Sequence, residues 1–217
     1  MSTLAGICPV ARFYPIVPDV DWLARIAPLG IETVQLRLKD AEPAEIRRQI
    51  AGSLAVCAVH GVQLIVNDYW REAIALGAGY VHLGQEDLAA ADLKAIKGAG
   101  LGLGISTHDE AELAVALAAR PDYVALGPIY ETKLKAMKWA PQGLSRLGAW
   151  RAAIDADARA AGIAPPALVA IGGLTPERAA AVFGAGAQSL AVITDFLTHE
   201  KPERRIREWM AVTQRAG

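Results

Sequence analysis

Carboxylate and amide side chains follow two neighbouring apolar runs of the sequence. Asn67 and Asp68 end one run, and Gln85–Asp87 ends the next. If both runs are parallel strands, their ends lie close together, and two carboxylates with neutral oxygens nearby suit a hard cation such as Mg2+ that also binds phosphate oxygens. We therefore predict that Asp68 and Asp87 are metal ligands. For Asp87 the alternative of a simple helix cap stays open, because aspartate often has that role at a strand end.

Polar side chains alternate with leucines in the segment that ends at Lys39. Gln35, Arg37 and Lys39 lie two residues apart, so a strand would place all three on one face, which we expect to point into the interior of the fold. Cations in an interior are costly without partners, and an anion or a carboxylate is therefore expected beside them. The partner is a bound anionic substrate or a strand-end acid such as Asp68, and both can be present together.

A different kind of anion site is predicted near the end of the chain. Gly172 and Gly173 follow the apolar run Leu168–Ile171, and Ile193 and Thr194 end a later apolar run. In barrel enzymes the loops after the last two strands often bind phosphate through backbone N–H groups, and glycine lets a ligand approach the backbone. The alternative for the glycine pair is a tight turn with positive φ. Two anion sites in one fold suggest two phosphorylated small-molecule substrates.

Eight apolar runs supply these residues, and segments of helical pattern separate them. The runs are Phe13–Asp19, Thr33–Lys39, Gln63–Asp68, Tyr80–Gln85, Gly102–Thr107, Tyr123–Ile129, Ala167–Leu174 and Ser189–Asp195. This alternation is typical of βαβ units and a parallel sheet. Eight units in 217 residues predict an α/β fold, a (β/α)8 TIM barrel in which residues 1–217 form a single domain. The functional residues would then meet at the carboxyl ends of the strands. Between two runs, Thr107 and Glu110 are spaced as a capping box for the following helix.

Composition excludes several classes of partner. The net charge of -1 argues against binding to nucleic acid, and the longest uncharged stretch, Ala160–Pro176, contains two prolines and two glycines that make it a poor membrane span. Met1–Val10 lacks the pattern of a signal peptide, and Cys8 and Cys57 form no disulfide framework. We therefore expect a cytoplasmic protein with no nucleic-acid or membrane partner. The sequence leaves the oligomeric state open, a homo-oligomer included.

Several motifs together carry a resemblance to a known family. They are QLRLK at 35–39, VND ending at Asp68, HLGQED at 82–87, GIST ending at Thr107, the segment Gly127–Gly143, AIGGL at 170–174 and GAGAQSLAVIT at 184–194. Across nearly its whole length the chain resembles the thiamine-phosphate synthases. The resemblance implies a transferase of thiamine biosynthesis with Mg2+ as cofactor. Such an enzyme joins a hydroxymethylpyrimidine diphosphate to a thiazole phosphate, or its carboxylated form, and releases pyrophosphate.

The resemblance also implies a role for individual residues. Asp68 and Asp87 would bind Mg2+. The contacts to the pyrimidine diphosphate would be Gln35, Arg37, Lys39, Asn67, Ser106 and Lys135, and the catalytic residues among them would be Arg37, Lys39, Ser106 and Lys135. The contacts to the thiazole phosphate would be Thr132, Gly173, Ile193 and Thr194.

The residues themselves fit this chemistry. Diphosphate leaves more easily when its developing charge is neutralised, which is a task for Mg2+ and for cations. The thiazole nitrogen is the nucleophile, so no Ser-His-Asp arrangement is needed, and the segment Tyr130–Gln142 has the length of a lid. His82, inside an apolar run, is better explained as a hydrogen-bonded interior group than as a general base. Trp139 either anchors the lid by packing or covers the substrate rings.

One segment departs from the family pattern. Many members have Pro-Thr-x-Thr-Lys after the sixth strand, whereas this chain has Glu131 in place of the proline and Leu134 in place of the second threonine. These differences weaken the assignment of the thiazole side. Two alternative functions remain: a thiazole tautomerase of the same fold, or a non-catalytic protein that binds a phosphorylated ligand. The tautomerase alternative leaves the metal and diphosphate motifs unexplained, and Pro128 stands where tautomerases carry a histidine.

Overall fold

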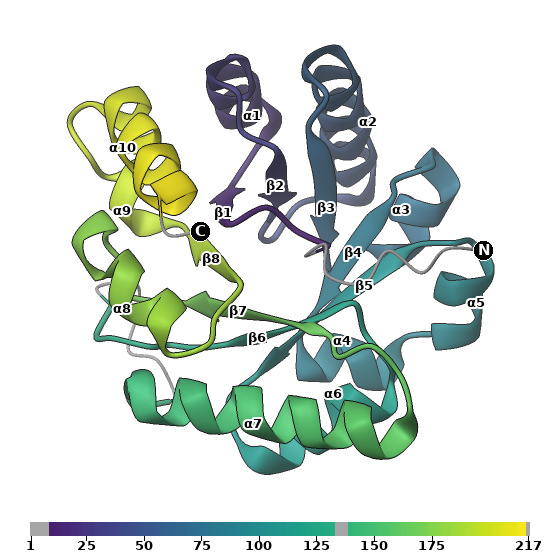
Figure 1. Cartoon of the computed structure of the whole chain (residues 1–217). Coiled ribbons are helices and arrows are strands. Elements are labelled where there is room, and N and C mark those ends of the chain that lie inside the picture. The colour runs from purple at the N-terminus through teal and green to yellow at the C-terminus, as the bar shows by residue number, and fades with distance from the viewer. Residues whose placement is uncertain (1–8, 133–138, 216–217) are drawn as a thin grey trace.

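Eight parallel strands close into a barrel in sequence order, with β8 paired to β1. The computed structural model describes residues 9–132 and 139–215. Figure 1 shows the strands arranged as a ring with the helices outside it. The strands are β1 (Phe13–Val17), β2 (Thr33–Leu36), β3 (Gln63–Asn67), β4 (Tyr80–Leu83), β5 (Gly102–Thr107), β6 (Tyr123–Leu126), β7 (Ala167–Ile171) and β8 (Ser189–Val192). The prediction of an α/β barrel is confirmed.

Helices cover the outside of this barrel. They are α1 (Val20–Ile26), α2 (Pro43–His60), α3 (Trp70–Leu76), α4 (Gln85–Ala90), α5 (Leu93–Gly98), α6 (Glu110–Ala118), α7 (Gly143–Ala161), α8 (Ala179–Gly184), α9 (Thr194–Leu197) and α10 (Pro202–Arg215), with 3-10 turns at Ala27–Leu29 and Pro176–Arg178. The longer helices have clear sequence boundaries: α2 begins at a proline, and Gly162 ends α7 in a left-handed conformation with φ +66.

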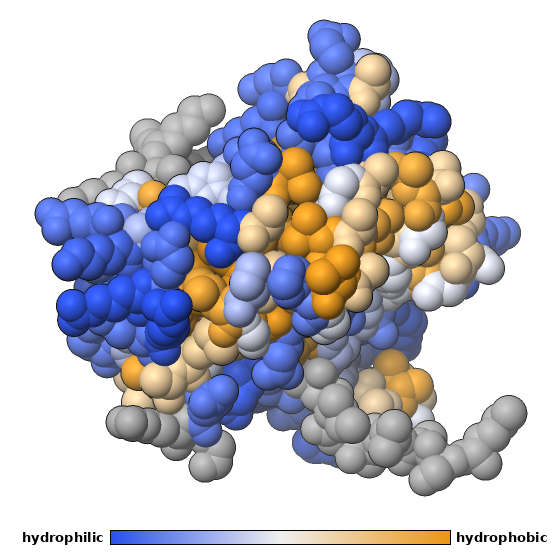
Figure 2. Space-filling view, turned by 90° about the horizontal axis from the view of Figure 1, so that it is seen from above, coloured by the Kyte–Doolittle hydropathy of each residue, from blue (hydrophilic) through white to orange (hydrophobic). Residues whose placement is uncertain are grey.

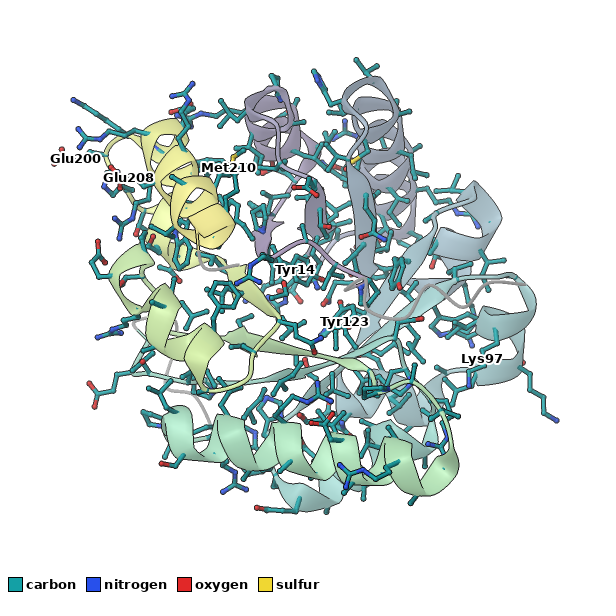
Figure 3. All side chains as sticks on the ribbon, viewed as in Figure 1. Tyr14, Lys97, Tyr123, Glu200, Glu208 and Met210 are labelled. Carbon is teal, nitrogen blue, oxygen red and sulfur yellow. The ribbon has the colours of Figure 1, made fainter. Side chains whose placement is uncertain are left out.

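Two apolar cores result from the alternation of side chains along the strands. The larger core lies between the strands and the helices and contains residues such as Leu36, Val81 and Trp150. The smaller core lies inside the barrel and includes Tyr14 and Tyr123. Figure 3 shows these two tyrosines within the ring of strands, whereas the labelled charged side chains lie at the periphery.

Glycines make room for aromatic rings inside the barrel. A Cβ atom on Gly104 would lie 2.0 Å from the Cζ atom of Tyr123, and one on Gly102 would lie 2.1 Å from the Cζ atom of Tyr80. No side chain fits at these distances, so the two strand glycines are required by close packing. The tyrosine rings of β4 and β6 therefore occupy space that β5 leaves empty.

The last helix is fixed to the barrel by buried polar and aromatic contacts. Arg205 on α10 donates two hydrogen bonds to the carboxylate of Asp195, of 2.7 and 2.9 Å, and Trp209 Nε1 donates to the same carboxylate at 2.7 Å. The Trp209 ring also stacks on Phe13 of β1, with ring centroids 5.7 Å apart.

Figure 2, a view from above relative to Figure 1, shows hydrophilic side chains around a smaller apolar region. No helix in the described residues has the length and apolar character needed to cross a bilayer.

Two local predictions are wrong. Strand β2 ends at Leu36, so Arg37 and Lys39 lie in the following loop, and Lys39 is exposed rather than inside the barrel. The backbone amide of Arg37 still donates to Val17 O of β1, at 2.9 Å, but the alternation in the sequence continues beyond this last contact. Thr107 forms no capping box either: its hydroxyl donates to Ala125 O and accepts from Trp150 Nε1, while Asp109 caps α6.

Candidate active site

Asp68 and Asp87 lie together at the carboxyl ends of β3 and β4, as predicted. Their carboxyl groups are within hydrogen-bonding distance, and burial followed by the negative charge of Asp87 raises the pKa of Asp68 to about 6. Asp68 has a left-handed backbone with φ +64, which is uncommon outside glycine and often occurs at functional sites. Its backbone amide donates to His82 O at 2.9 Å, which fixes this conformation. The N-cap of α4 (Gln85–Ala90) is Gly84 and Asp87 lies inside the first turn, so the alternative in which Asp87 caps the helix is wrong.

The aspartate pair fits a divalent cation. Two carboxylates this close repel one another when both are charged, and a cation between them would remove the repulsion. Asn67 donates its side-chain amide to Asp68 and so holds that carboxylate in place. Within the described residues no group of three or more His, Cys, Asp or Glu side chains could hold a metal. The other ligands would therefore be water and substrate oxygens, which is usual for Mg2+.

Arg37 acts on this part of the site through its charge. The arginine is half-buried, and its positive charge opposes the rise in the pKa of Asp68. Among the residues that the structure describes, Arg37 forms no ion pair with a carboxylate. The alternative of an internal ion pair with Asp68 is therefore wrong, and the guanidinium remains available to an anion.

Inside the barrel, five side chains are joined by hydrogen bonds. Gln35 Nε2 donates to the Tyr14 hydroxyl at 2.6 Å, and the Tyr14 and Tyr123 hydroxyls are 2.8 Å apart. His82 Nδ1 lies 2.9 Å from the Tyr123 hydroxyl, and His82 Nε2 lies 2.8 Å from Ser106 Oγ. Burial, and secondly the charge of Arg37, lowers the pKa of His82 to about 4, so the imidazole is neutral at pH 7. His82 is thus the hydrogen-bonded interior group that its place in the sequence predicts.

A cavity of about 330 Å3 lies at the ends of β7 and β8. Its lining includes four residues predicted for an anion site, namely Thr132, Gly173, Ile193 and Thr194. Gly173 has φ +64, and a Cβ atom there would lie 2.4 Å from Glu131 O. The turn thus requires glycine for backbone reasons, and the same glycine also lines the cavity. The backbone amides of Gly173 and Ile193 donate to no acceptor in the described part of the chain.

The charged residues that line this cavity differ in whether they have an ion-pair partner. Its lining contains the acids Glu131 and Asp195 and the cation Arg178. Asp195 is paired with Arg205, whereas Arg178 has no carboxylate partner among the residues described. The Arg178 guanidinium donates to Gly173 O and lies 4.3 Å from the centre of the Tyr130 ring. Sequence reasoning missed this cation. The signal that could have found it is its position in the turn that directly follows the glycine pair.

The ends of the segment after β6 are held to the barrel. Gln142 N donates to Pro128 O at 2.7 Å, and the Trp139 ring stacks on His108 with centroids 5.3 Å apart. His108 in turn is 2.8 Å from a carboxylate oxygen of Glu112. Trp139 therefore makes a packing contact at the mouth. The predictions for Lys135 and Leu134 fall outside the described residues.

Comparison with known proteins places the chain in a family. The family model described as thiamine monophosphate synthase matches residues 13–196. The chain belongs to this family. It is 54% identical to the thiamine-phosphate synthase of Rhizobium etli over 93% of this chain and 94% of the relative. It is 45% identical to that of Salmonella typhimurium, over 83% of this chain and 82% of the relative. A solved thiamine phosphate pyrophosphorylase from Pyrococcus furiosus has the same fold, with a TM-score of 0.78, 22% identity and coverage of 94% and 96% of the two chains.

Set beside the family's motifs, the predicted residues fall into two groups at the barrel mouth. Asn67, Asp68, Asp87 and Ser106 lie at or after the ends of β3 to β5, and the cavity residues follow β6 to β8. Gln35 lies within β2 and is buried inside the barrel. Lys39 lies in a loop on the first side and is exposed. The thiamine monophosphate synthase fold thus brings together most of the residues that the motifs single out.

Proposed function

We propose that this protein is a thiamine-phosphate synthase, a cytoplasmic transferase of one domain. Its substrates would be 4-amino-2-methyl-5-hydroxymethylpyrimidine diphosphate and thiazole phosphate, or the carboxylated form of the latter. The observation that carries the proposal is the pairing of Asp68 with Asp87 on one side of the mouth and a separate cavity with unpaired backbone amides on the other. Two phosphorylated substrates need two such sites. The 54% identical relative from Rhizobium etli bears the same name.

In this proposal the diphosphate lies over the ends of β2 to β5. Asp68 and Asp87 would hold Mg2+, which when bound supplies positive charge to the leaving diphosphate. Arg37 adds a second positive charge, and Asn67 and Ser106 donate hydrogen bonds. Lys39 and Lys135 would complete the set from the loops. Together these groups stabilise the charge that develops as the carbon–oxygen bond of the pyrimidine methylene breaks.

The thiazole phosphate would bind in the cavity after β7 and β8. The backbone amides of Gly173 and Ile193 point to a phosphate there, helped by the hydroxyls of Thr132 and Thr194 and by the charge of Arg178. The thiazole nitrogen then forms the new bond to the pyrimidine methylene carbon as pyrophosphate leaves. The nitrogen lone pair makes this bond, so no protein group has to act as a general base. The protein's task is to align the two substrates and to exclude water.

A pyrophosphate-release assay tests this function. The purified full-length chain with Mg2+ should release pyrophosphate only when both substrates are present. A change in the thiazole phosphate alone, without pyrophosphate, would indicate the tautomerase, and binding without any turnover would indicate a non-catalytic protein. Either result would overturn the proposal.

A further inference from the structure

The hydrogen-bonded side chains inside the barrel connect Ser106, a residue of the proposed substrate site, with Gln35, which the family resemblance also assigns to the pyrimidine diphosphate. Ser106 stands at one end and Gln35 at the other, and Tyr14, Tyr123 and His82 lie between them. Gln35, Tyr14, Tyr123 and His82 are buried, whereas Ser106 is half-buried at the mouth. We name this set the interior chain. No step in the proposed reaction uses its three middle members.

Proton counting gives the interior chain a direction. Gln35 donates through Nε2, so the Tyr14 oxygen already accepts one bond and its own proton needs an acceptor. The Tyr123 oxygen, 2.8 Å away, is the acceptor within reach among the described residues. If Tyr123 donated to Tyr14 instead, the buried Tyr14 proton would have no partner, which buried hydroxyls rarely tolerate.

The same counting determines which ring nitrogen of His82 carries the proton. Since Tyr123 accepts from Tyr14, its own proton goes to His82 Nδ1, which must therefore be unprotonated. The neutral imidazole then carries its proton on Nε2 and donates to Ser106 Oγ. Ser106 accepts that bond, and its hydroxyl proton is left to point away from the interior.

Packing prevents these groups from turning. The His82 ring stacks on the Tyr123 ring, with centroids 5.6 Å apart and an interplanar angle of 18°, and the Tyr14 ring meets Tyr123 edge-on at 6.0 Å. Gly104 leaves the space that the Tyr123 hydroxyl end occupies. On the mouth side, Gln85 Nε2 donates to Ser106 O at 2.6 Å and fixes the serine backbone.

We propose that the interior chain orients the Ser106 hydroxyl as a hydrogen-bond donor towards the barrel mouth, and that His82 and Tyr123 are positioning residues for it. The inference rests on the proposed function for the identity of the acceptor, which would be an oxygen of the diphosphate. An oriented donor needs no reorganisation when charge develops on that oxygen, which is the general advantage of preorganised hydrogen bonds. His82 therefore acts through Ser106 and does not touch the substrate.

Nitrogen-15 NMR of the wild-type protein tests the direction without any assay of activity. The His82 signals are assigned by their loss in His82→Gln, and the spectrum reports which ring nitrogen carries the proton. We expect the proton on Nε2 between pH 6 and 8. A proton on Nδ1 would mean that Ser106 donates inwards and would overturn the proposal, whether or not the protein is a synthase.

A double-mutant cycle tests the consequence for turnover. Tyr123→Phe removes one neutral hydrogen-bonding group and should lower kcat about three- to tenfold while the KM for thiazole phosphate stays within about twofold. In the Ser106→Ala background the same substitution should have no further effect on kcat, because its target is gone. Equal losses in both backgrounds would show a merely structural role and overturn the proposal.

A matched control separates positioning from packing. Ile65→Val removes one methyl group from the same inner core, where Ile65 is fully buried, but changes no polar group of the interior chain. This variant should keep wild-type kcat. If Ile65→Val lowers kcat as much as Tyr123→Phe does, loss of packing explains both and the positioning role is wrong. If the wild type releases no pyrophosphate, the proposed function fails and the NMR result alone decides the direction.

Discussion

The two sides of the barrel mouth are built from different chemical groups. On the side of β2 to β5 the candidate site consists of side chains, such as Asp68, Asp87 and Ser106. On the side of β7 and β8 it consists mainly of backbone amides in turns whose glycines have positive φ. Side chains can be exchanged one by one, whereas a backbone amide changes only with the course of the chain. We therefore expect substitutions on the first side to affect kcat and those on the second to affect KM.

The two sides also differ in electrostatics. The aspartate pair is unfavourable as it stands, because burial and mutual repulsion raise the pKa of Asp68 to about 6. The β7–β8 cavity is lined by two acids, Glu131 and Asp195, of which Asp195 is neutralised by Arg205, and by the cation Arg178. One side thus offers carboxylates to a cation, and the other offers backbone amides and the Arg178 guanidinium to an anion. This complementarity allows a metal-bound diphosphate and a free phosphate to bind next to each other.

The largest expected effect is on kcat, from substitutions of the two aspartates on the β2–β5 side of the mouth. Asp68→Asn and Asp87→Asn should each lower kcat by about a hundredfold or more, since metal charge stabilisation amounts to several kcal/mol and each ~1.4 kcal/mol is tenfold in rate. Circular dichroism should show an intact fold. Asp92→Asn, at the cap of α5 where asparagine serves equally well, is the matched control and should keep full activity. Wild-type rates for both site variants at limiting Mg2+ would contradict the metal role.

Glycine substitutions test whether the turn at Gly173 binds the thiazole phosphate or is only a tight turn. Gly173→Ala places a Cβ atom 2.4 Å from Glu131 O, whereas Gly162→Ala has φ +66 and nothing within 4 Å of the new atom. Left-handed alanine alone costs about 1–2 kcal/mol, so Gly162→Ala measures that part in chemical denaturation. Gly173→Ala should be clearly less stable and should raise the KM for thiazole phosphate more than that for the diphosphate. Equal changes in both KM values would favour a turn with no role in binding.

Arg178 tests whether a side chain assists the backbone amides. Arg178→Ala should raise the KM for thiazole phosphate about tenfold, because a hydrogen bond to a charged group contributes about 1.5 kcal/mol or more. The KM for the pyrimidine diphosphate should not change. Arg204→Ala, which removes an exposed arginine paired with Glu208 on α10, is the control. If both variants behave alike, general surface charge and not a phosphate contact is responsible.

The smallest expected effect is on stability. A carboxyl group whose pKa is raised in the folded state stabilises the fold while it is protonated and loses this contribution as the pH rises. For Asp68 the loss runs from the unfolded value of about 4 up to about 6. Without metal, the wild type should therefore melt a few degrees below Asp68→Asn at pH 7.5 but not at pH 4, and Mg2+ should restore the wild type. A difference independent of pH would contradict the repulsion between the two aspartates.

Much of the fold and of the aspartate site could be predicted from the sequence, because both depend on local patterns. Runs of apolar residues bounded by turn residues predict all eight strands, and the acids at the ends of two neighbouring runs predict the meeting of Asp68 and Asp87. Parallel strands bring their ends together whatever their detailed packing. The errors arose where a local pattern continued past the element that it describes. The alternation up to Lys39 is correct as a pattern, but strand β2 ends at Leu36.

Tertiary structure decided whatever depends on residues far apart in the chain. The sequence placed Ser106, His82 and Gln35 on strands, but their connection through Tyr14 and Tyr123 exists only because Gly104 leaves room for a tyrosine ring from the next strand. In the same way, Thr107 has the spacing of a capping residue and is instead buried between Ala125 and Trp150. Local sequence determines the period of each element and the order of the elements along the chain. The space that each side chain occupies, and the partner that satisfies its polar atoms, are set by neighbours that only the closed barrel brings within reach.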